Sequence, residues 1–227
     1  MNLDNKVVLV TGAKGGLGNF VTNAFLEAGA RVVGVSRSIK ADDFPHPRFS
    51  AAQAELSSAA EARKLTAQFE RIDALVHLVG TFAGGQTVAE TDDANFDRMF
   101  NTNFKSALYL IQALLPLMRQ AGGGHILAIG SRAALEPQPT IGAYAASKAA
   151  LLALIRTVAL ENRDKHVSAN IVLPATMDTP ANRSAMPQAD FSKWVQPAEV
   201  ASLLVHLAAS QPGQISGAAI PIYGGEL

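Results

Sequence analysis

Short apolar runs recur along the chain and alternate with longer stretches of helical periodicity. The runs have the length of strands and cover residues 7–10, 31–35, 74–79, 125–129, 168–172 and 218–222. Strands that alternate with helices usually form a parallel sheet with helices on both faces. The pattern therefore predicts an α/β fold with a doubly wound parallel sheet.

Two long segments are predicted to be helices with broad apolar faces. Residues 95–119 carry apolar side chains at helical spacing, and the three glycines at 122–124 are expected to end this helix. Residues 144–162 are rich in Ala and Leu on nearly all sides. Because one sheet surface is not expected to cover both faces, we predict a homodimer or a homotetramer.

A long irregular region follows the fifth predicted strand. Residues 174–195 contain three prolines and few periodic positions. Since long irregular segments in compact domains are commonly functional, we predict that residues 175–197 form a lid over the site. The composition suggests no linker, so residues 1–227 are expected to form a single domain.

Composition and charge exclude several classes of function. The 227 residues carry 19 basic and 19 acidic side chains, which argues against nucleic acid or an anionic membrane as partner and favours a small-molecule substrate. The absence of cysteine excludes disulfides and thiolate metal sites, and no metal site is expected. The polar start and the short apolar stretch 149–160, interrupted by Arg156, predict neither an export signal nor a membrane span. We therefore expect a cytoplasmic protein.

A glycine-rich loop joins the first predicted strand to a helix. It reads Thr11-Gly-Ala-Lys-Gly-Gly-Leu-Gly18, and in this context such a loop binds the pyrophosphate of a dinucleotide, as in Rossmann-type folds. Gly12 permits the tight turn, Gly16 the approach of the pyrophosphate, and Gly18 close helix packing. Lys14 and Leu17 of the same loop are also expected to contact the cofactor.

The end of the second predicted strand favours NADP(H) over NAD(H). An acidic residue at this point would bind the ribose hydroxyls of NAD, but the chain has Ser36 and Arg37. Ser36 can donate to a 2′-phosphate and Arg37 can pair with it. Asp42 and Asp43 follow later on the loop and remain candidates to reach a ribose.

Four polar residues form a candidate catalytic group. Tyr144 and Lys148 lie one helical turn apart, so the ammonium can share a site with the phenol. The ammonium and an oxidised nicotinamide are both expected to favour the phenolate. Ser131 follows the strand 125–129, where its hydroxyl can hold a substrate oxygen. Asn103 is polar within an apolar helix, and we expect it to break the helical ladder and fix a water that relays protons from Lys148.

These motifs together resemble one known family. The glycine loop, Asn103, Ser131, Tyr144-x-x-x-Lys148 and the C-terminal Gly217 with Tyr223-Gly-Gly225 are similar to the short-chain dehydrogenase/reductase family over essentially the whole chain. The resemblance implies a sheet of about seven strands, hydride transfer with a nicotinamide cofactor, and subunits paired through the two long helices. It also implies that Tyr144 is the acid or base and that Lys148 holds the nicotinamide ribose.

The resemblance assigns further residues to the cofactor and has two departures. Gly80, Pro174 and Thr179 are implied cofactor contacts, with Thr179 at the nicotinamide carboxamide. Where most members have Asn-Asn-Ala-Gly, this chain has His77-Leu-Val-Gly80, and Ala175 replaces a glycine after Pro174. We interpret His77 as a structural residue that is hydrogen-bonded near a strand end, because a single buried histidine usually is.

The leading hypothesis is an NADPH-dependent reductase of a ketone, an aldehyde or a pterin-like compound. Residues 173–194 and 80–85 resemble quinonoid dihydropteridine reductase, whereas Ser131 is the serine of the family's carbonyl and alcohol members. The alternatives are an alcohol dehydrogenase of the same fold, quinonoid dihydropteridine reductase proper, and a catalytically silent regulatory subunit. Loss of Tyr144 or Lys148 would indicate the silent subunit, and both are present.

Overall fold

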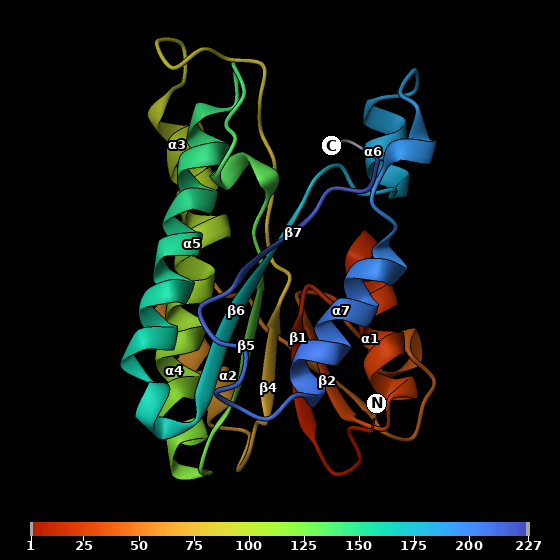
Figure 1. Ribbon diagram of the computed structural model, residues 1–227, viewed down its shortest axis with the longest axis vertical. Coiled ribbons are helices and arrows are strands. Elements are labelled where there is room, and N and C mark those ends of the chain that lie inside the picture. Colours follow the sequence, from red (N-terminus) through yellow and green to blue (C-terminus); the bar gives the residue numbers. More distant parts are fainter. Residues whose placement is uncertain (1, 226–227) are drawn as a thin grey trace.

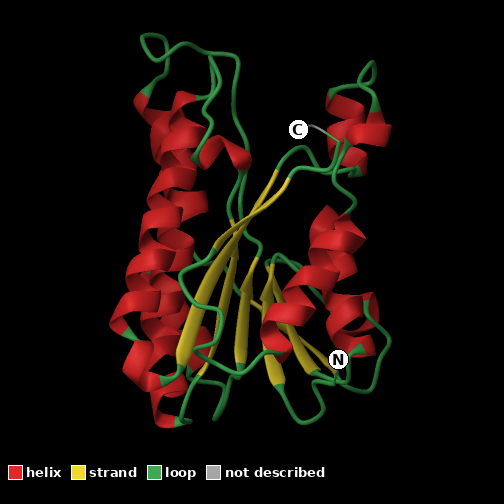
Figure 2. Ribbon diagram, in the orientation of Figure 1, coloured by secondary structure: helices red, strands yellow, loops and turns green. Residues whose placement is uncertain are grey.

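The computed structural model describes residues 2–225 and contains a seven-stranded, wholly parallel sheet between two layers of helices (Figures 1 and 2). The spatial order is β3-β2-β1-β4-β5-β6-β7, so the chain starts in the middle of the sheet and winds outward in both directions. The predicted fold class is confirmed. The strands are β1 (Val7–Thr11), β2 (Arg31–Ser36), β3 (Phe49–Gln53), β4 (Ala74–His77), β5 (Gly124–Ile129), β6 (Val167–Pro174) and β7 (Ala219–Ile222).

Helices cover both faces of the sheet and enclose two apolar cores. One core lies under α1 (Gly16–Glu27) and α7 (Pro197–Ala209), and the other lies under α2 (Ala59–Thr66), α4 (Ser106–Gln120) and α5 (Gly142–Glu161). Successive residues of a strand point to opposite faces, so Val8 and Val10 of β1 enter the first core and Leu9 enters the second. The short helices α3 (Asp93–Phe100) and α6 (Pro180–Ala185) lie beyond the carboxyl ends of the strands.

Strand β3 was not predicted from the apolar pattern. Its sequence Phe-Ser-Ala-Ala-Gln has no run of branched apolar residues, and its residues are exposed or half-buried. The strand lies at the edge of the sheet and pairs only with β2 among the described strands. An edge strand is covered less completely than a central one, so it does not require a continuous apolar sequence.

The first predicted long helix is divided in the structure. A π-helical turn over Asn101–Lys105 separates α3 from α4, which confirms the expected local break of the helical ladder at Asn103. Gly122 and Gly123 end α4 with φ angles of +85° and +135°, in the region that favours glycine. The second predicted helix corresponds to α5, within two residues at each end.

Helix α5 is the one described helix that is long and apolar enough to cross a membrane by length and composition, which the sequence analysis did not anticipate. Half of that window is buried inside the protein, and the helix packs on β6. Its buried residues join the core that it shares with α2 and α4. Packing against the sheet therefore accounts for its apolar composition.

Candidate active site

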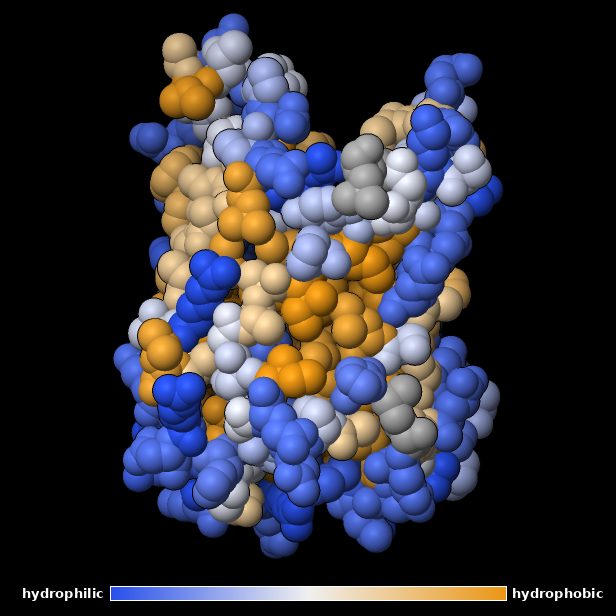
Figure 3. Space-filling view, viewed as in Figure 1, coloured by the Kyte–Doolittle hydropathy of each residue, from blue (hydrophilic) through white to orange (hydrophobic). Residues whose placement is uncertain are grey.

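The carboxyl ends of the central strands meet at one end of the molecule. From β1 the chain adds β2 and β3 on one side of the sheet, and it then crosses to the other side of β1 to add β4. The connections therefore lead in opposite directions at the boundary between β1 and β4. In doubly wound sheets, ligands bind in the crevice at such a point. Figure 3 shows that the surface is hollowed at this end, between the region of α6 and the region that leads into α3. The candidate site residues lie on the loops and helix ends that follow the carboxyl ends of β1, β2, β4, β5 and β6.

The glycine loop has a backbone that side chains would obstruct. Gly12 has a φ of +70°, which favours glycine. A Cβ at Gly18 would collide with the carbonyl oxygen of Gly12 and lie 2.6 Å from that of Ala13. Helix α1 begins at Gly16, and its N-cap Gly15 has no side chain to bond the N–H groups of the first turn. These donors and the helix dipole fit the pyrophosphate of a dinucleotide.

Two other residues of the loop have contacts of their own. The side chain of Leu17 is buried in the core under α1 and α7, so a cofactor contact by this residue would be limited to its backbone. Lys14 pairs with Asp43, with 3.0 Å between Nζ and Oδ1. Asp43 also accepts the N–H of Lys40 at 2.7 Å. These bonds lower the pKa of the Asp43 carboxyl, the Lys40 N–H being the main cause.

Ser36 and Arg37 lie beside the glycine loop. The Gly12 N–H donates to the carbonyl oxygen of Val35 at 2.8 Å, which ties the loop to the end of β2. Ser36 is the half-buried last residue of that strand, and Arg37 follows it with an exposed side chain. The structure thus brings both residues next to the loop.

Tyr144, Lys148 and Ser131 converge at the start of α5. The Ser131 side chain lies close enough to the Tyr144 phenol to lower its pKa, and Ser131 caps the short 3-10 helix Arg132–Ala134 after β5. Lys148 lies one turn along α5 with its side chain buried, and its Nζ donates to the carbonyl oxygen of Ile129 at 2.9 Å. The end of β5 therefore supplies a partner to each of the two side chains of α5.

Burial is the main cause of the pKa shifts of Tyr144 and Lys148. Burial raises the pKa of Tyr144, and the hydrogen bond from Ser131 opposes this rise only in part. Burial lowers the pKa of Lys148 to about 8. Desolvation is the main influence on Tyr144, and Lys148, which is bonded to a carbonyl oxygen, is not among the causes of its pKa shift. Tyr144 is thus a protonated phenol at neutral pH. The expected shift toward phenolate, which also depends on an oxidised nicotinamide, stays a prediction.

Both the oxygen and the nitrogen of the Asn103 side-chain amide are hydrogen-bonded. Its Oδ1 accepts the Thr81 N–H at 2.7 Å, and its Nδ2 donates to the Thr81 carbonyl oxygen and to Ser147 Oγ, each at 3.0 Å. A Cβ at Gly80 would lie 3.2 Å from Lys148 Nζ and 3.3 Å from Asn103 Oδ1. Gly80 therefore permits the π-helical turn, the β4 end and Lys148 to approach one another.

His77 has the structural role predicted for it. The side chain is 1% exposed, and both ring nitrogens have hydroxyl partners: Thr11 Oγ1 at 3.1 Å from Nδ1 and Ser106 Oγ at 3.3 Å from Nε2. Burial, with a smaller effect of the Lys148 charge, lowers the pKa of His77 to about 3. The ring is therefore neutral at physiological pH.

Phe82 is a site residue that the sequence analysis missed. Its ring packs edge-on against Tyr144, with 5.0 Å between centroids, yet its side chain is 62% exposed. The same loop is fixed by the Gly85 N–H, which donates to the Thr140 carbonyl oxygen at 2.9 Å. The exposed Phe82 ring therefore places an apolar surface beside the phenol. A phenylalanine in a glycine-rich turn gave no periodic signal by which it could have been found.

The segment 175–197, which we call the lid segment, contacts the glycine loop. Pro174 pairs with Ile222 at the end of β6. Thr179 caps α6, and a Cβ at Gly16 would lie 3.2 Å from its Cβ and Cγ2 atoms. Thr179 therefore lies directly on the N-terminus of α1, next to the proposed phosphate donors.

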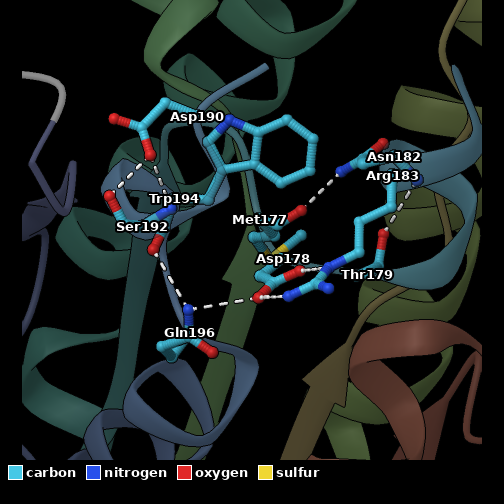
Figure 4. A network of polar contacts seen from close by, with 9 residues as sticks. All are labelled: Met177, Asp178, Thr179, Asn182, Arg183, Asp190, Ser192, Trp194 and Gln196. Atoms are coloured by element: carbon cyan, nitrogen blue, oxygen red, sulfur yellow. Dashed lines mark hydrogen bonds and ion pairs between the residues drawn. The ribbon is translucent and has the colours of Figure 1, made fainter. Parts of the chain in front are cut away.

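A polar network holds the lid segment together (Figure 4). Arg183 donates to both carboxylate oxygens of Asp178, at 2.5 and 2.8 Å, and Gln196 donates to the same carboxylate at 3.3 Å. The Arg183 guanidinium also lies over the ring of Phe191, 4.7 Å from its centroid. Trp194 is buried, and its carbonyl oxygen accepts a hydrogen bond from Gln196 Nε2 at 3.4 Å. The segment is thus a structured cap with two short helices, although its sequence reads as irregular.

Residues 2–225 contain no cluster of three or more His, Asp or Glu side chains that could hold a metal ion. The polar groups at the candidate site are instead a phenol, a hydroxyl, an ammonium and an amide, which suit hydrogen bonding and proton transfer.

Comparisons with known proteins agree with this geometry. Residues 6–190 match the family model described as short chain dehydrogenase. The chain is 30% identical to 2,3-dihydro-2,3-dihydroxybenzoate dehydrogenase of Escherichia coli K12, covering 99% of this chain and 98% of that protein. It is 31% identical to the rhamnolipid biosynthesis 3-oxoacyl-[acyl-carrier-protein] reductase of Pseudomonas aeruginosa, covering 99% and 97%.

A solved structure shares the fold over nearly its full length. It is the Pseudomonas aeruginosa RhlG/NADP active-site complex, with a TM-score of 0.89, 30% identity, and coverage of 99% of this chain and 97% of that chain. These relatives do not extend the likeness of the lid segment to quinonoid dihydropteridine reductase, which stays a prediction. The family match, the relatives and the fold agree that this chain belongs to the short-chain dehydrogenase/reductase family and is an oxidoreductase with a nicotinamide dinucleotide cofactor.

Proposed function

We propose that the chain is an NADPH-preferring reductase of a small ketone or aldehyde. The observation that carries the proposal is the grouping of Ser131, Tyr144 and the buried Lys148 where α5 begins beside the end of β5. Ser131 matches the serine of carbonyl and alcohol members of the family. Tyr144 and Lys148, whose loss would indicate a silent regulatory subunit, are both present.

The chemistry divides between the cofactor and the residues of this chain. Bound NADPH supplies a hydride. Ser131 orients the substrate oxygen by hydrogen bonding, and Tyr144 donates its phenolic proton to that oxygen. The raised pKa of Tyr144 supports this direction, because a protonated phenol is a proton donor at neutral pH. Lys148 holds the nicotinamide ribose, and Asn103 fixes the water through which the proton is replaced.

The remaining cofactor contacts follow from the positions of the loops. The glycine loop, from Gly12 to Gly18, binds the pyrophosphate, and Gly80, Pro174 and Thr179 lie toward the nicotinamide. The contact of Thr179 with Gly16 supports this placement. Because Thr179 begins α6, the lid segment is proposed to close over the substrate after the cofactor has bound.

Replacing Ser131 tests the substrate class. NADPH oxidation is measured against diketones, quinones, acetoacetyl thioesters and quinonoid dihydropterin. We expect Ser131→Ala to lower turnover of a ketone by at least about tenfold, since the substrate oxygen loses a hydrogen-bond donor. Ser50→Ala, on the exposed edge strand β3, is the matched control. A mild effect with activity confined to the pterin would favour the pterin reductase alternative and contradict the carbonyl proposal.

Replacing Arg37 tests the cofactor preference. Lys14 is already paired with Asp43, so Arg37 is proposed as the principal cation for the 2′-phosphate, with Ser36 as a second donor. A charge-assisted contact contributes roughly 1.5–3 kcal/mol, so Arg37→Ala should reduce the preference for NADPH over NADH about tenfold or more. Fluorescence titration measures both dissociation constants. Arg31→Ala, at the opposite end of β2, is the control, and equal affinities in the unmutated protein would refute the preference.

A homodimer or homotetramer is proposed from the outer faces of α4 and α5. Leu108, Leu115 and Leu154 are only half-buried in the single chain. A partner subunit would complete their burial. Light scattering at micromolar concentration should give a dimer or tetramer mass, and Leu154→Glu should lower it, whereas Val88→Glu, outside both helices, should not. The mass of a single chain for the unmutated protein would contradict the proposal.

A further inference from the structure

A chain of buried hydrogen bonds links the sheet to the π-helical turn through His77. His77 is the last residue of β4 and pairs with Thr11 of β1 in the sheet register. Its ring lies between the Thr11 hydroxyl, 3.1 Å from Nδ1, and the Ser106 hydroxyl, 3.3 Å from Nε2. Ser106 is the first residue of α4 and directly follows the π-helical turn. All three side chains are buried.

The partners of the two hydroxyls determine which ring nitrogen carries the proton. Ser106 donates its hydroxyl proton to the Thr102 carbonyl oxygen at 2.6 Å, so toward His77 it can only accept. His77 Nε2 must therefore carry a hydrogen. In a neutral ring Nδ1 is then the acceptor, and Thr11 donates to it. Thr11 Oγ1 in turn accepts the Leu78 N–H at 3.2 Å, so every donor in the chain has an acceptor.

The end of this chain lies at the candidate active site. The Thr102 carbonyl belongs to the same π-helical turn as Asn103. Asn103 is hydrogen-bonded to the backbone N–H and carbonyl oxygen of Thr81. Its Oδ1 and the Lys148 Nζ both lie close to Gly80, at 3.3 and 3.2 Å from the position of a Cβ there. A shift of the turn would therefore move Asn103 relative to Lys148 without touching a substrate.

We propose that His77, as its neutral Nε2–H tautomer, is a positioning residue that fixes the π-helical turn against the ends of β1 and β4 and so sets the place of Asn103 beside Lys148. The kinetic part of this inference rests on the proposed function. The tautomer and the anchoring of the turn do not. The buried ring, whose pKa is about 3, keeps this tautomer throughout the physiological pH range.

Nitrogen-15 NMR of the imidazole tests the tautomer directly. We expect the shifts of a neutral Nε2–H ring that do not change between pH 5 and 8. An Nδ1–H ring, or titration within that range, would overturn the proposal even if no substrate had been found. Amide hydrogen exchange tests the anchoring: residues 102–106 should exchange at least about fivefold faster in Ser106→Ala, the effect of losing a buried hydrogen bond.

Substitution of His77 tests the effect on turnover. His77→Phe should lower kcat at least about fivefold while the KM for substrate changes little, because Asn103 and Lys148 act on the reaction and not on substrate affinity. His77→Gln places an amide donor near the Nε2 position and should restore most of the loss. His125→Phe, at another buried histidine on β5, is the control for stability and should leave kcat unchanged.

The outcomes separate the inference from the proposed function. If His77→Phe folds and keeps kcat within twofold, or if His77→Gln is as impaired as His77→Phe, the positioning role is wrong. If His77→Phe does not fold, Ser106→Ala carries the same kinetic test with the ring in place. Failure to reduce any carbonyl would refute the proposed function, while the NMR and exchange results would still decide on the tautomer and the anchor.

Discussion

Replacing Tyr144 by phenylalanine is expected to lower turnover by at least about a hundredfold, the low end of general acid–base contributions, while leaving cofactor affinity nearly unchanged. The ring and its edge-on contact with Phe82 are retained, and only the hydroxyl is lost. Hydride transfer to a carbonyl leaves a negatively charged oxygen that needs a proton. Ser131 orients that oxygen but has a pKa too high to supply the proton at neutral pH.

Steady-state kinetics and fluorescence titration of NADPH measure the two effects. Tyr109→Phe, on α4, is the matched control because it removes a phenol from outside the hydrogen-bonded group. The pKa shifts add a pH criterion: reduction should lose rate only on the alkaline side, first where Lys148, with a pKa of about 8, loses its proton, and then where the Tyr144 phenol deprotonates. If Tyr144→Phe kept turnover within about threefold on an authentic substrate, the proposed mechanism would be wrong.

The features that could be predicted from sequence are those with local signals. Strand length, helical spacing and the glycine loop each depend on residues close together in the chain, and the structure confirms the fold that they indicated. The separation of Tyr144 and Lys148 by one helical turn also follows from helical geometry. Even the π-helical turn had a local signal, the polar Asn103 within an apolar segment.

The features that were missed depend on contacts between distant segments. Phe82 and Tyr144 meet because the loop after β4 docks on the start of α5, and Lys14 meets Asp43 because the loop after β2 returns to the glycine loop. The pKa of Tyr144 also depends on such contacts. Spacing brought the ammonium near the phenol, but burial by other segments, which sequence does not record, has the larger effect.

Burial of the Lys148 ammonium lowers the free energy of unfolding at neutral pH. A buried ammonium is disfavoured, and the hydrogen bond from Lys148 to the Ile129 carbonyl oxygen does not restore its ordinary pKa of 10.5. The folded pKa is about 8, so between pH 8 and 10.5 the unfolded chain binds more protons than the folded chain. The free energy of unfolding therefore rises with pH in this window, by on the order of 3 kcal/mol.

Lys148→Met is accordingly expected to separate function from stability. The variant keeps most of the side-chain volume and removes the ammonium, so turnover should fall at least about a hundredfold and NADPH should bind more weakly, because the proposed ribose contact is lost. The free energy of unfolding of the variant minus that of the unmutated protein should be larger at pH 7 than at pH 10.5, by on the order of 3 kcal/mol. The reason is that only the unmutated protein gains stability over this range, as Lys148 loses its proton. Urea unfolding at both pH values measures this difference, and Lys64→Met, an exposed lysine on α2, controls for loss of a positive charge. A relative stability that does not change with pH would mean that Lys148 is solvated in the folded protein, and turnover within about threefold of the unmutated enzyme would remove it from the catalytic group.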